Sequence, residues 1–118
     1  MEIHFGTTRC TILIGIFAIK IPRLCSHLNF LKGCLGNWKE RDFCKQFKCL
    51  PDYYNLVVPS IFCSWFGLVQ VQYRCDKLKL TDKVDLSKFK TKSICSDLTY
   101  HNFGYYKGKL VCLDYADD

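Results

Sequence analysis

The residues best suited to do chemistry lie near the end of the sequence. Asp97 and Asn102 are five positions apart, and Asp114 follows Asn102 by twelve. A glycine-containing segment leads from Asn102 into the apolar run at residues 110–113, which ends at Asp114. A polar loop followed by a buried strand that ends on a carboxylate can form a metal–phosphate site. In such a site Asn102 and Asp114 would hold the same cation, and Asp97 would face a hydroxyl nucleophile.

Two strands and a helix are expected to position a second group of polar residues near the start of the chain. Residues 11–15 and 16–22 are apolar and β-branched, which indicates two strands around Gly15, and Lys20 interrupts the second of them. If Lys20 is buried, it needs a carboxylate partner, because an unpaired buried ammonium group is very costly. Glu40 lies twenty residues beyond Lys20 and could be that partner.

Glu40 falls within a helix that we expect from about residue 26 to residue 47. Ser26 is a suitable N-cap for this helix. Helical spacing of large apolar residues supports it, at Leu28, Leu31, Leu35 and Trp38. Gly33 and Gly36 lower the stability of a helix by about 1 kcal/mol each, so another element is expected to approach the helix closely at these positions.

Taken together, these segments resemble the nucleotide-binding elements of the protein-kinase-like fold, including its aminoglycoside-phosphotransferase-type relatives. Ala18-Ile19-Lys20 is similar to the kinase strand whose lysine holds the nucleotide phosphates and pairs with a glutamate on the next helix. The segment from Asp97 to Asn102, followed by Asp114, is similar to the catalytic loop and the metal-binding aspartate. Compact chains of this kind also resemble phage or mobile-element proteins.

The resemblance assigns a role to each of the candidate residues. It implies that Lys20 contacts the phosphates of ATP and that Glu40 orients Lys20. It also implies that Asp97 faces the acceptor hydroxyl, while Asn102 and Asp114 hold Mg²⁺. Lys20, Glu40 and Asp114 are therefore expected to converge in the folded chain. The cofactors of an active enzyme would therefore be Mg²⁺ and ATP, and a non-enzymatic protein would need none.

The chain departs from a kinase in length and in its glycines. A chain of 118 residues is expected to form one domain, residues 1–118, which is shorter than a complete kinase fold. Almost no chain follows Asp117, so we expect no activation segment and no substrate-binding helices. The glycine-rich loop that covers the phosphates is also missing, because only Gly6 and Gly15 lie near the first strands.

The middle of the chain completes the predicted fold. Residues 56–65 indicate one strand broken at Pro59 near a sheet edge, and residues 68–73 alternate as a half-buried antiparallel strand. Residues 74–79 would form the hinge, and residues 82–89 a short helix. The sequence thus predicts an α+β domain with a mainly antiparallel sheet and one packed helix, resembling a truncated protein-kinase-like fold.

Composition narrows the class of protein and the partners it would bind. Apolar content of 49% and aromatic content of 15% exclude a disordered chain. The net charge is +6, and many lysines of the chain lie between residues 77 and 92. We interpret this stretch as a solvated surface. The sequence contains no nucleic-acid-binding motif, so a protein is favoured as partner over nucleic acid. No apolar stretch is long enough to span a membrane.

The nine cysteines of the chain help to predict the cellular compartment of the protein. Their number is odd and none forms a Cys-x-x-Cys pair, so a structural zinc site is not expected. Several lie in apolar runs, where they would act as small hydrophobic residues of a cytoplasmic protein.

We therefore expect a reduced kinase-like domain that binds nucleotide weakly, or has lost catalysis and serves as a protein-interaction module. Whether the chain is an enzyme is left open, with the missing glycine loop favouring the non-enzymatic form. Two alternatives remain at this point. They are an active small phosphotransferase that uses Mg·ATP and a secreted binding protein held by disulfides.

Overall fold

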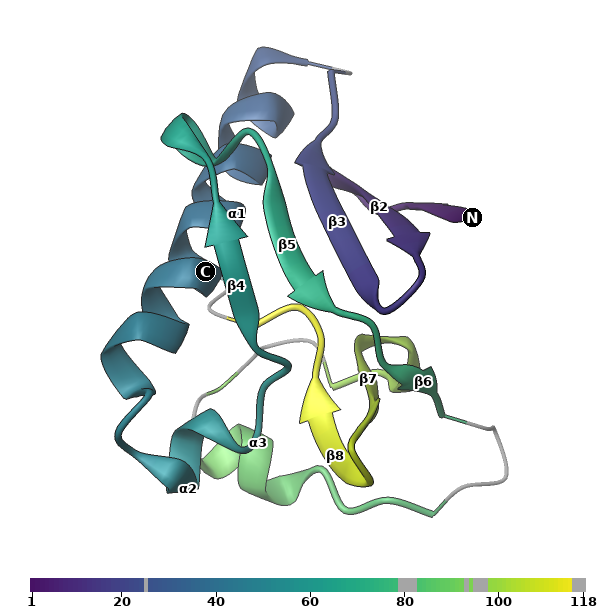
Figure 1. The fold of residues 1–118 in the computed structure, drawn as a ribbon, viewed down its shortest axis with the longest axis vertical. Helices are drawn as coiled ribbons and strands as arrows, with labels where there is room; N and C mark the ends of the chain where they lie inside the picture. Colours follow the sequence, from purple (N-terminus) through teal and green to yellow (C-terminus); the bar gives the residue numbers. More distant parts are fainter. Residues whose placement is uncertain (25, 79–82, 93, 95–97, 116–118) are drawn as a thin grey trace.

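The computed structural model describes residues 1–24, 26–78, 83–92, 94 and 98–115. In these residues the chain forms two antiparallel sheets and one long helix (Figure 1). The larger sheet has the strand order β1-β2-β3-β5-β4, and the smaller sheet has the order β6-β7-β8. The predicted α+β fold, with a mainly antiparallel sheet and one main helix, is confirmed.

The elements follow one another in an order close to the predicted one. The larger sheet contains β1 (Glu2–Phe5), β2 (Arg9–Ile14), β3 (Phe17–Pro22), β4 (Ser60–Cys63) and β5 (Gln70–Tyr73). The smaller sheet contains β6 (Asp76–Lys77), β7 (Phe103–Tyr106) and β8 (Lys109–Cys112). The helices are α1 (His27–Phe47), α2 (Pro51–Tyr54) and α3 (Ser87–Thr91), with 3-10 turns η1 (Trp65–Gly67) and η2 (Tyr100–Asn102).

The first two predicted strands form the hairpin β2–β3. Gly15 lies in its turn with a φ of +56°, a backbone conformation that glycine adopts without steric cost. Strand β1 was not predicted. It pairs with β2 at the edge of the sheet, and all of its residues are exposed.

Helix α1 begins where the sequence predicts, but its large apolar residues do not face the sheet. Ser26 is the N-cap, and its Oγ accepts a hydrogen bond of 3.1 Å from the backbone N–H of Asn29. The helix buries small and polar residues, namely Gly33, Cys34, Asn37, Glu40 and Cys44. The apolar series expected from the helical spacing lies on the exposed side, at Leu28, Leu31, Leu35 and Trp38.

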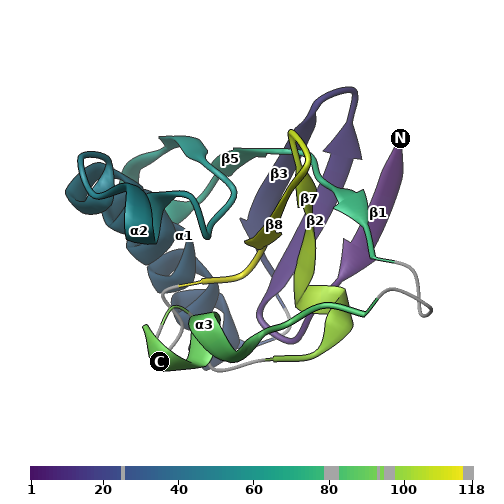
Figure 2. The same ribbon diagram turned by 90° about the horizontal axis from the view of Figure 1, so that it is seen from below.

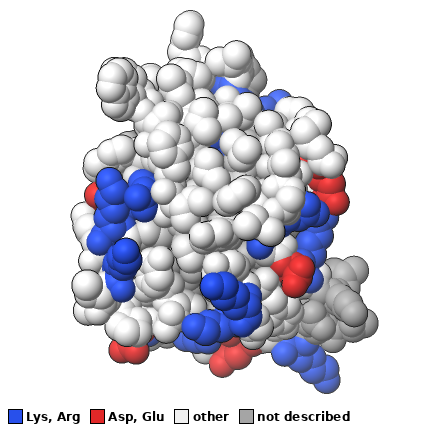
Figure 3. All heavy atoms as spheres, in the orientation of Figure 1, with Lys and Arg blue, Asp and Glu red and all other residues white. Residues whose placement is uncertain are grey.

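The larger sheet also turns a polar face inward. Lys20, Gln70 and Gln72 are almost fully buried on the side that α1 covers. On the opposite side, the aromatic rings of Phe17 and Tyr73 stack and remain partly exposed. Figure 3 shows a broad area without charged side chains over β3 and β5. The alternation predicted for β5 is therefore present, with its glutamines on the buried side.

The main apolar core lies instead beside the smaller sheet. Val58, Phe89 and Tyr115 have no exposed surface, and they pack with Phe103 and Val111 in one cluster. The rings of Phe89 and Phe103 meet edge to face at 4.8 Å. Figure 2 shows α2 and α3 beside this part of the molecule, with α1 extending away along the larger sheet. The molecule thus has a polar interior in one half and an apolar core in the other.

Three local predictions need correction. The glycine-containing segment after Asn102, for which no strand was predicted, contains strand β7, which pairs with β8 through the two-residue turn Lys107-Gly108. The short helix begins at Ser87, later than expected, and residues 79–82 lie outside the described part of the chain. Strand β4 is an edge strand as predicted, but it begins only at Ser60, after Pro59.

The cysteines of the described residues are free thiols. They are Cys10, Cys34, Cys44, Cys49, Cys63, Cys75 and Cys112. Burial raises the pKa of the Cys75 thiol to about 12. A framework of four disulfides would need eight of the nine cysteines, so these free thiols are incompatible with it. No helix within the described residues is long and apolar enough to cross a membrane.

Candidate functional site

The structure brings together three of the residues singled out from the sequence. The Nζ atom of Lys20 lies 3.0 Å from Oε1 of Glu40 and 2.6 Å from Oδ1 of Asp114. Lys20 reaches this point from β3, Glu40 from α1, and Asp114 from the segment that follows β8. The predicted meeting of the three side chains is therefore present, although they are far apart in the sequence.

The ammonium group of Lys20 has a third bond, to the backbone carbonyl oxygen of Leu113 at 2.8 Å. A lysine has three N–H donors and no acceptor. The three bonds to Glu40, Leu113 and Asp114 therefore use every donor that Lys20 has. Lys20 is only 3% exposed, so its ammonium group is held by protein rather than by solvent.

Glu40 is the acceptor at the centre of the network, and it has no exposed surface. Besides Lys20, it accepts hydrogen bonds from Arg9 at 2.8 and 2.9 Å, Gln70 at 2.8 Å, Gln72 at 3.2 Å and the backbone N–H of Tyr115 at 3.0 Å. A buried carboxylate needs such partners, because burial without them would be very costly. Gln70 and Gln72 of β5 are therefore buried because they donate hydrogen bonds to the Glu40 carboxylate.

Sequence reasoning missed Arg9, the second cation of the site. Arg9 holds Glu40 through both nitrogens of its guanidinium fork, and one of them also lies 3.3 Å from Oδ1 of Asp114. Arg9 stands at the first position of β2, outside every motif considered. Only the packing of α1 across the sheet places it opposite Glu40. The Arg9 side chain passes beside Gly36 of the helix, where a Cβ atom would lie 3.4 Å from Cζ of Arg9.

Within the described residues two cations, Arg9 and Lys20, meet two carboxylates, Glu40 and Asp114, and the cations affect the pKa of Asp114. Burial by itself would raise the pKa of Asp114, but the Lys20 ammonium and the Arg9 guanidinium outweigh it and lower that pKa to about 2. Asp114 is therefore ionised at neutral pH. Its side chain is 50% exposed, in contrast to Lys20 and Glu40, so Asp114 is the solvent-facing member of the network.

Asn102 meets Asp114 through the main chain. The backbone N–H of Asp114 donates to Oδ1 of Asn102 at 2.8 Å, and Nδ2 of Asn102 donates to the backbone oxygen of Asp114 at 3.2 Å. The Asn102 amide therefore clamps the segment that carries the Asp114 carboxylate. The described residues contain no group of three or more His, Cys, Asp or Glu side chains that could hold a metal ion. Asp97 lies outside the described residues.

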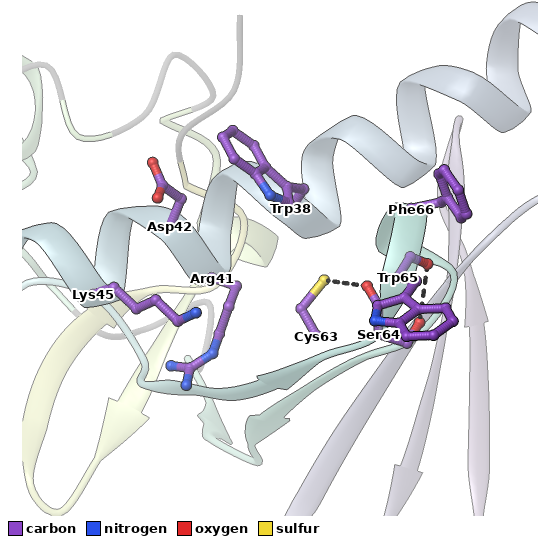
Figure 4. Close-up of a pocket in the computed structure, with 8 residues that line it drawn as sticks. All are labelled: Trp38, Arg41, Asp42, Lys45, Cys63, Ser64, Trp65 and Phe66. Carbon is purple, nitrogen blue, oxygen red and sulfur yellow. Dashed lines mark hydrogen bonds between the residues drawn. The ribbon is translucent and has the colours of Figure 1, made fainter.

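A second feature, which the sequence did not suggest, is a groove between α1 and the segment from β4 to η1 (Figure 4). Its volume is about 530 Å³. Its walls combine aromatic and charged side chains, namely Trp38, Arg41, Asp42, Lys45, Cys63, Ser64, Trp65 and Phe66. In Figure 4 Arg41 and Lys45 lie toward one end, and Trp65 and Phe66 toward the other. The groove is separate from the Lys20 network.

Comparison of the chain with protein-family models, with curated proteins and with solved structures gives no match in any of the three.

Proposed function

We propose that this chain is a reduced kinase-like domain that has no phosphotransferase activity and acts as a cytoplasmic protein-interaction module. One observation carries the proposal: the three N–H donors of Lys20 are all held by Glu40, Leu113 and Asp114. A phosphate group could bind Lys20 only by displacing one of these partners. Two of the three partners are also bound by other residues, because Arg9 holds the Glu40 carboxylate and Asn102 holds the backbone of Asp114.

The thiols and the surface support the remaining parts of the proposal. Free cysteines in the described residues suit a reducing compartment such as the cytoplasm. Large apolar side chains are exposed on α1 and η1, as they are on surfaces that bind another protein. A protein partner fits such a surface better than nucleic acid, whose binding rests mainly on contacts to phosphates.

An active phosphotransferase is the second candidate, and the exposure of Asp114 favours it. The carboxylate is ionised and half exposed, which suits a ligand of Mg²⁺ bound together with ATP. In that case Lys20 would have to release a protein partner to contact the phosphates. Asn102 would likewise have to exchange its bonds to the Asp114 backbone for the metal.

Calorimetric titration of Mg·ATP separates the two candidates. We expect no binding heat for the natural protein, because its cations are already paired. We also expect Asp114→Ala to lower the melting temperature by about 4–8 °C, since it removes a carboxylate that contacts both Lys20 and Arg9. The control is Asp76→Ala, an exposed carboxylate on β6, which should leave the melting temperature unchanged.

The opposite result would support the enzyme. It consists of saturable Mg·ATP binding with measurable hydrolysis, both lost in Asp114→Ala while its melting temperature stays that of the natural protein.

A further inference from the structure

The exposed side of α1 has the spacing of a coiled-coil seam. Leu28, Leu31, Leu35 and Trp38 follow one another at intervals of three, four and three residues, which is the a/d pattern of paired helices. These side chains are 62%, 63%, 45% and 54% exposed. Within the described residues no other helix packs on these side chains, so the seam is free to bind a second helix.

Three of the four positions beside the seam are basic. Lys32 and Lys39 each follow a seam residue, at the e positions of the two heptads. Arg41 occupies a g position and also donates to the backbone oxygen of Ser60 at 2.8 Å, and the other g position is the buried Cys34. The only acidic residues of α1 are Glu40, which is buried against the sheet, and Asp42. Charges at e and g positions select the partner in coiled coils, because opposite charges lie side by side across the two helices. This seam therefore selects acidic flanks.

The groove described above continues the seam at its Trp38 end. Trp65 and Phe66 are 86% and 83% exposed, and they share the groove with Trp38. The loop that carries them is held against α1 by Gly67, where a Cβ atom would lie only 1.9 Å from the Cys34 carbonyl oxygen. Figure 4 shows Arg41 and Lys45 along the same helix, beyond these aromatic rings. The surface thus offers aromatic contacts and positive charge to one and the same ligand.

We propose that α1 docks an acidic amphipathic helix of a partner protein along its exposed seam, and this proposal rests on the interaction function proposed above. The partner helix places aliphatic side chains against the seam and Glu or Asp side chains beside Lys32 at one end and beside Arg41 and Lys45 at the groove. A second copy of this chain fits poorly, because two α1 helices would bring basic flanks together. A single-stranded nucleic acid fits poorly, because Leu28, Leu31 and Leu35 offer its phosphates no charge.

The natural tryptophans report on binding directly. The chain has two tryptophans, and both Trp38 and Trp65 line the groove. The probe is a synthetic peptide about three heptads long, with Leu at a and d and Glu at e and g, and without tryptophan. Repulsion among its own glutamates keeps it from pairing with itself. We expect it to shift the tryptophan emission to shorter wavelength and to become helical in circular dichroism when it binds.

Charge reversal tests the selectivity of the seam. The variant Lys32→Glu/Lys45→Glu should bind the glutamate peptide at least about tenfold more weakly, and should gain affinity for the matched peptide with Lys at e and g. The control Lys83→Glu/Lys109→Glu changes the net charge equally at exposed sites away from α1 and should bind like the natural protein. Leu31→Glu, on the exposed side of α1, should abolish binding while the protein stays folded.

Several results would overturn the proposal. The first two are equal affinity of the natural protein for the Glu and Lys peptides, and an equal loss of peptide affinity in the control variant. The third is an oligothymidylate that produces the same fluorescence change and competes with the peptide. The fourth is a dimer of the natural protein that Leu31→Glu dissociates. The Mg·ATP titration does not depend on this surface. If Mg·ATP binds in that titration, the non-catalytic function is refuted even when the peptide also binds. If only the peptide fails to bind, only the proposed docking surface is refuted.

Discussion

At the scale of single residues, Glu40 has a role that differs from the one its position in the sequence suggests. A glutamate between Lys39 and Arg41 on a helix would ordinarily be a solvated side chain paired with its neighbours. In the structure it has no exposed surface and binds Arg9 and Lys20 across the sheet. Its carboxylate is thus the group on which two buried cations depend.

Neutralising Glu40 should therefore be strongly destabilising. Glu40→Gln keeps the shape of the side chain but removes the fully buried carboxylate that both Arg9 and Lys20 contact, while the carboxylate of Asp114 is half exposed. We expect the free energy of unfolding, measured by urea denaturation, to fall by about 3–5 kcal/mol, as for other buried pairs that lose one partner.

The matched control is Asp42→Asn, two residues further along the same helix. Within the described residues its carboxylate accepts one exposed hydrogen bond, from Gln46, so the unfolding free energy should change by about 0.5 kcal/mol or less. Equal effects of the two substitutions would show that the network does not stabilise the fold.

Residues of this network could be predicted from the sequence where their chemistry requires a particular partner. They could not be predicted where the packing of the elements determines the partner. The pairing of Lys20 with Glu40 and Asp114 could be predicted, because a lysine in an apolar strand requires a carboxylate. Arg9 could not, since an arginine at the start of a strand is ordinarily solvated. The clamp formed by Asn102 was also hidden, because its partner is backbone that any sequence would provide.

At the scale of elements, the close packing of α1 on the hairpin β2–β3 depends on Gly33. A Cβ atom at this position would lie 2.5 Å from the backbone oxygen of Thr8 and 2.8 Å from Cβ of Pro22. Neither of these atoms is the flexible end of a side chain, so neither can move aside. At Gly36 the nearest atom would be Cζ of Arg9, at an ordinary contact distance of 3.4 Å.

The two glycines should therefore respond in opposite ways to the same substitution. We expect Gly33→Ala to destabilise the protein by about 1–3 kcal/mol, because the added methyl group forces α1 away from the sheet. Gly36→Ala should be neutral or stabilising by up to about 1 kcal/mol, because alanine favours the helix. Thermal unfolding of both variants provides the measurement. A loss of stability in Gly36→Ala as large as in Gly33→Ala would contradict the contacts described.

Elements with strong local signals could be predicted, and elements defined by pairing could not. The bounds of α1 follow from the Ser26 N-cap, and the hairpin β2–β3 follows from β-branched residues around Gly15. Strand β7 was missed because it begins Phe103-Gly104, and glycine weakens a strand. Gly104 is nevertheless required, because a Cβ atom there would lie 2.8 Å from the backbone oxygen of Asp76 on the neighbouring strand β6. The side of α1 that is buried depends on the polar interior, which no hydrophobic pattern could reveal.

At the scale of the whole molecule, the network connects the two halves of the fold. Arg9 and Lys20 belong to the larger sheet, whereas Asp114 follows the last strand of the smaller one. Tyr115, next to Asp114, is fully buried in the apolar core, where its hydroxyl donates to the backbone oxygen of Val58 at 2.7 Å. The ion pairs of Asp114 thus join the polar interior to the apolar core.

Acid should weaken this connection within a defined range of pH. The pKa of Asp114 is about 2 in the folded protein and close to 3.8 in an unfolded chain. Because the folded value is the lower one, the stabilisation is fully present above about pH 5 and is lost as the pH falls toward 2. Asp114 is half exposed, so solvent screening limits its contribution to on the order of 1 kcal/mol.

Urea unfolding of the natural protein and of Asp114→Asn between pH 6 and about pH 2.5 measures this contribution. The difference between their unfolding free energies should shrink steadily as the pH falls. A difference that stays constant over the whole range would contradict the lowered pKa.

The distances along the chain that the network spans also bear on the order in which the protein can fold. Arg9 and Asp114 are 105 residues apart, and Glu40 and the backbone of Tyr115 are 75 residues apart. Contacts of such separation form late, because a long loop must close before they contribute. A growing polypeptide can pair β2 with β3 and add α1, and Arg9 and Lys20 then already contact the carboxylate of Glu40. The carboxylate of Asp114 reaches these two cations only after β8 has been synthesised, so a late segment of the chain completes ion pairs that the first strands begin.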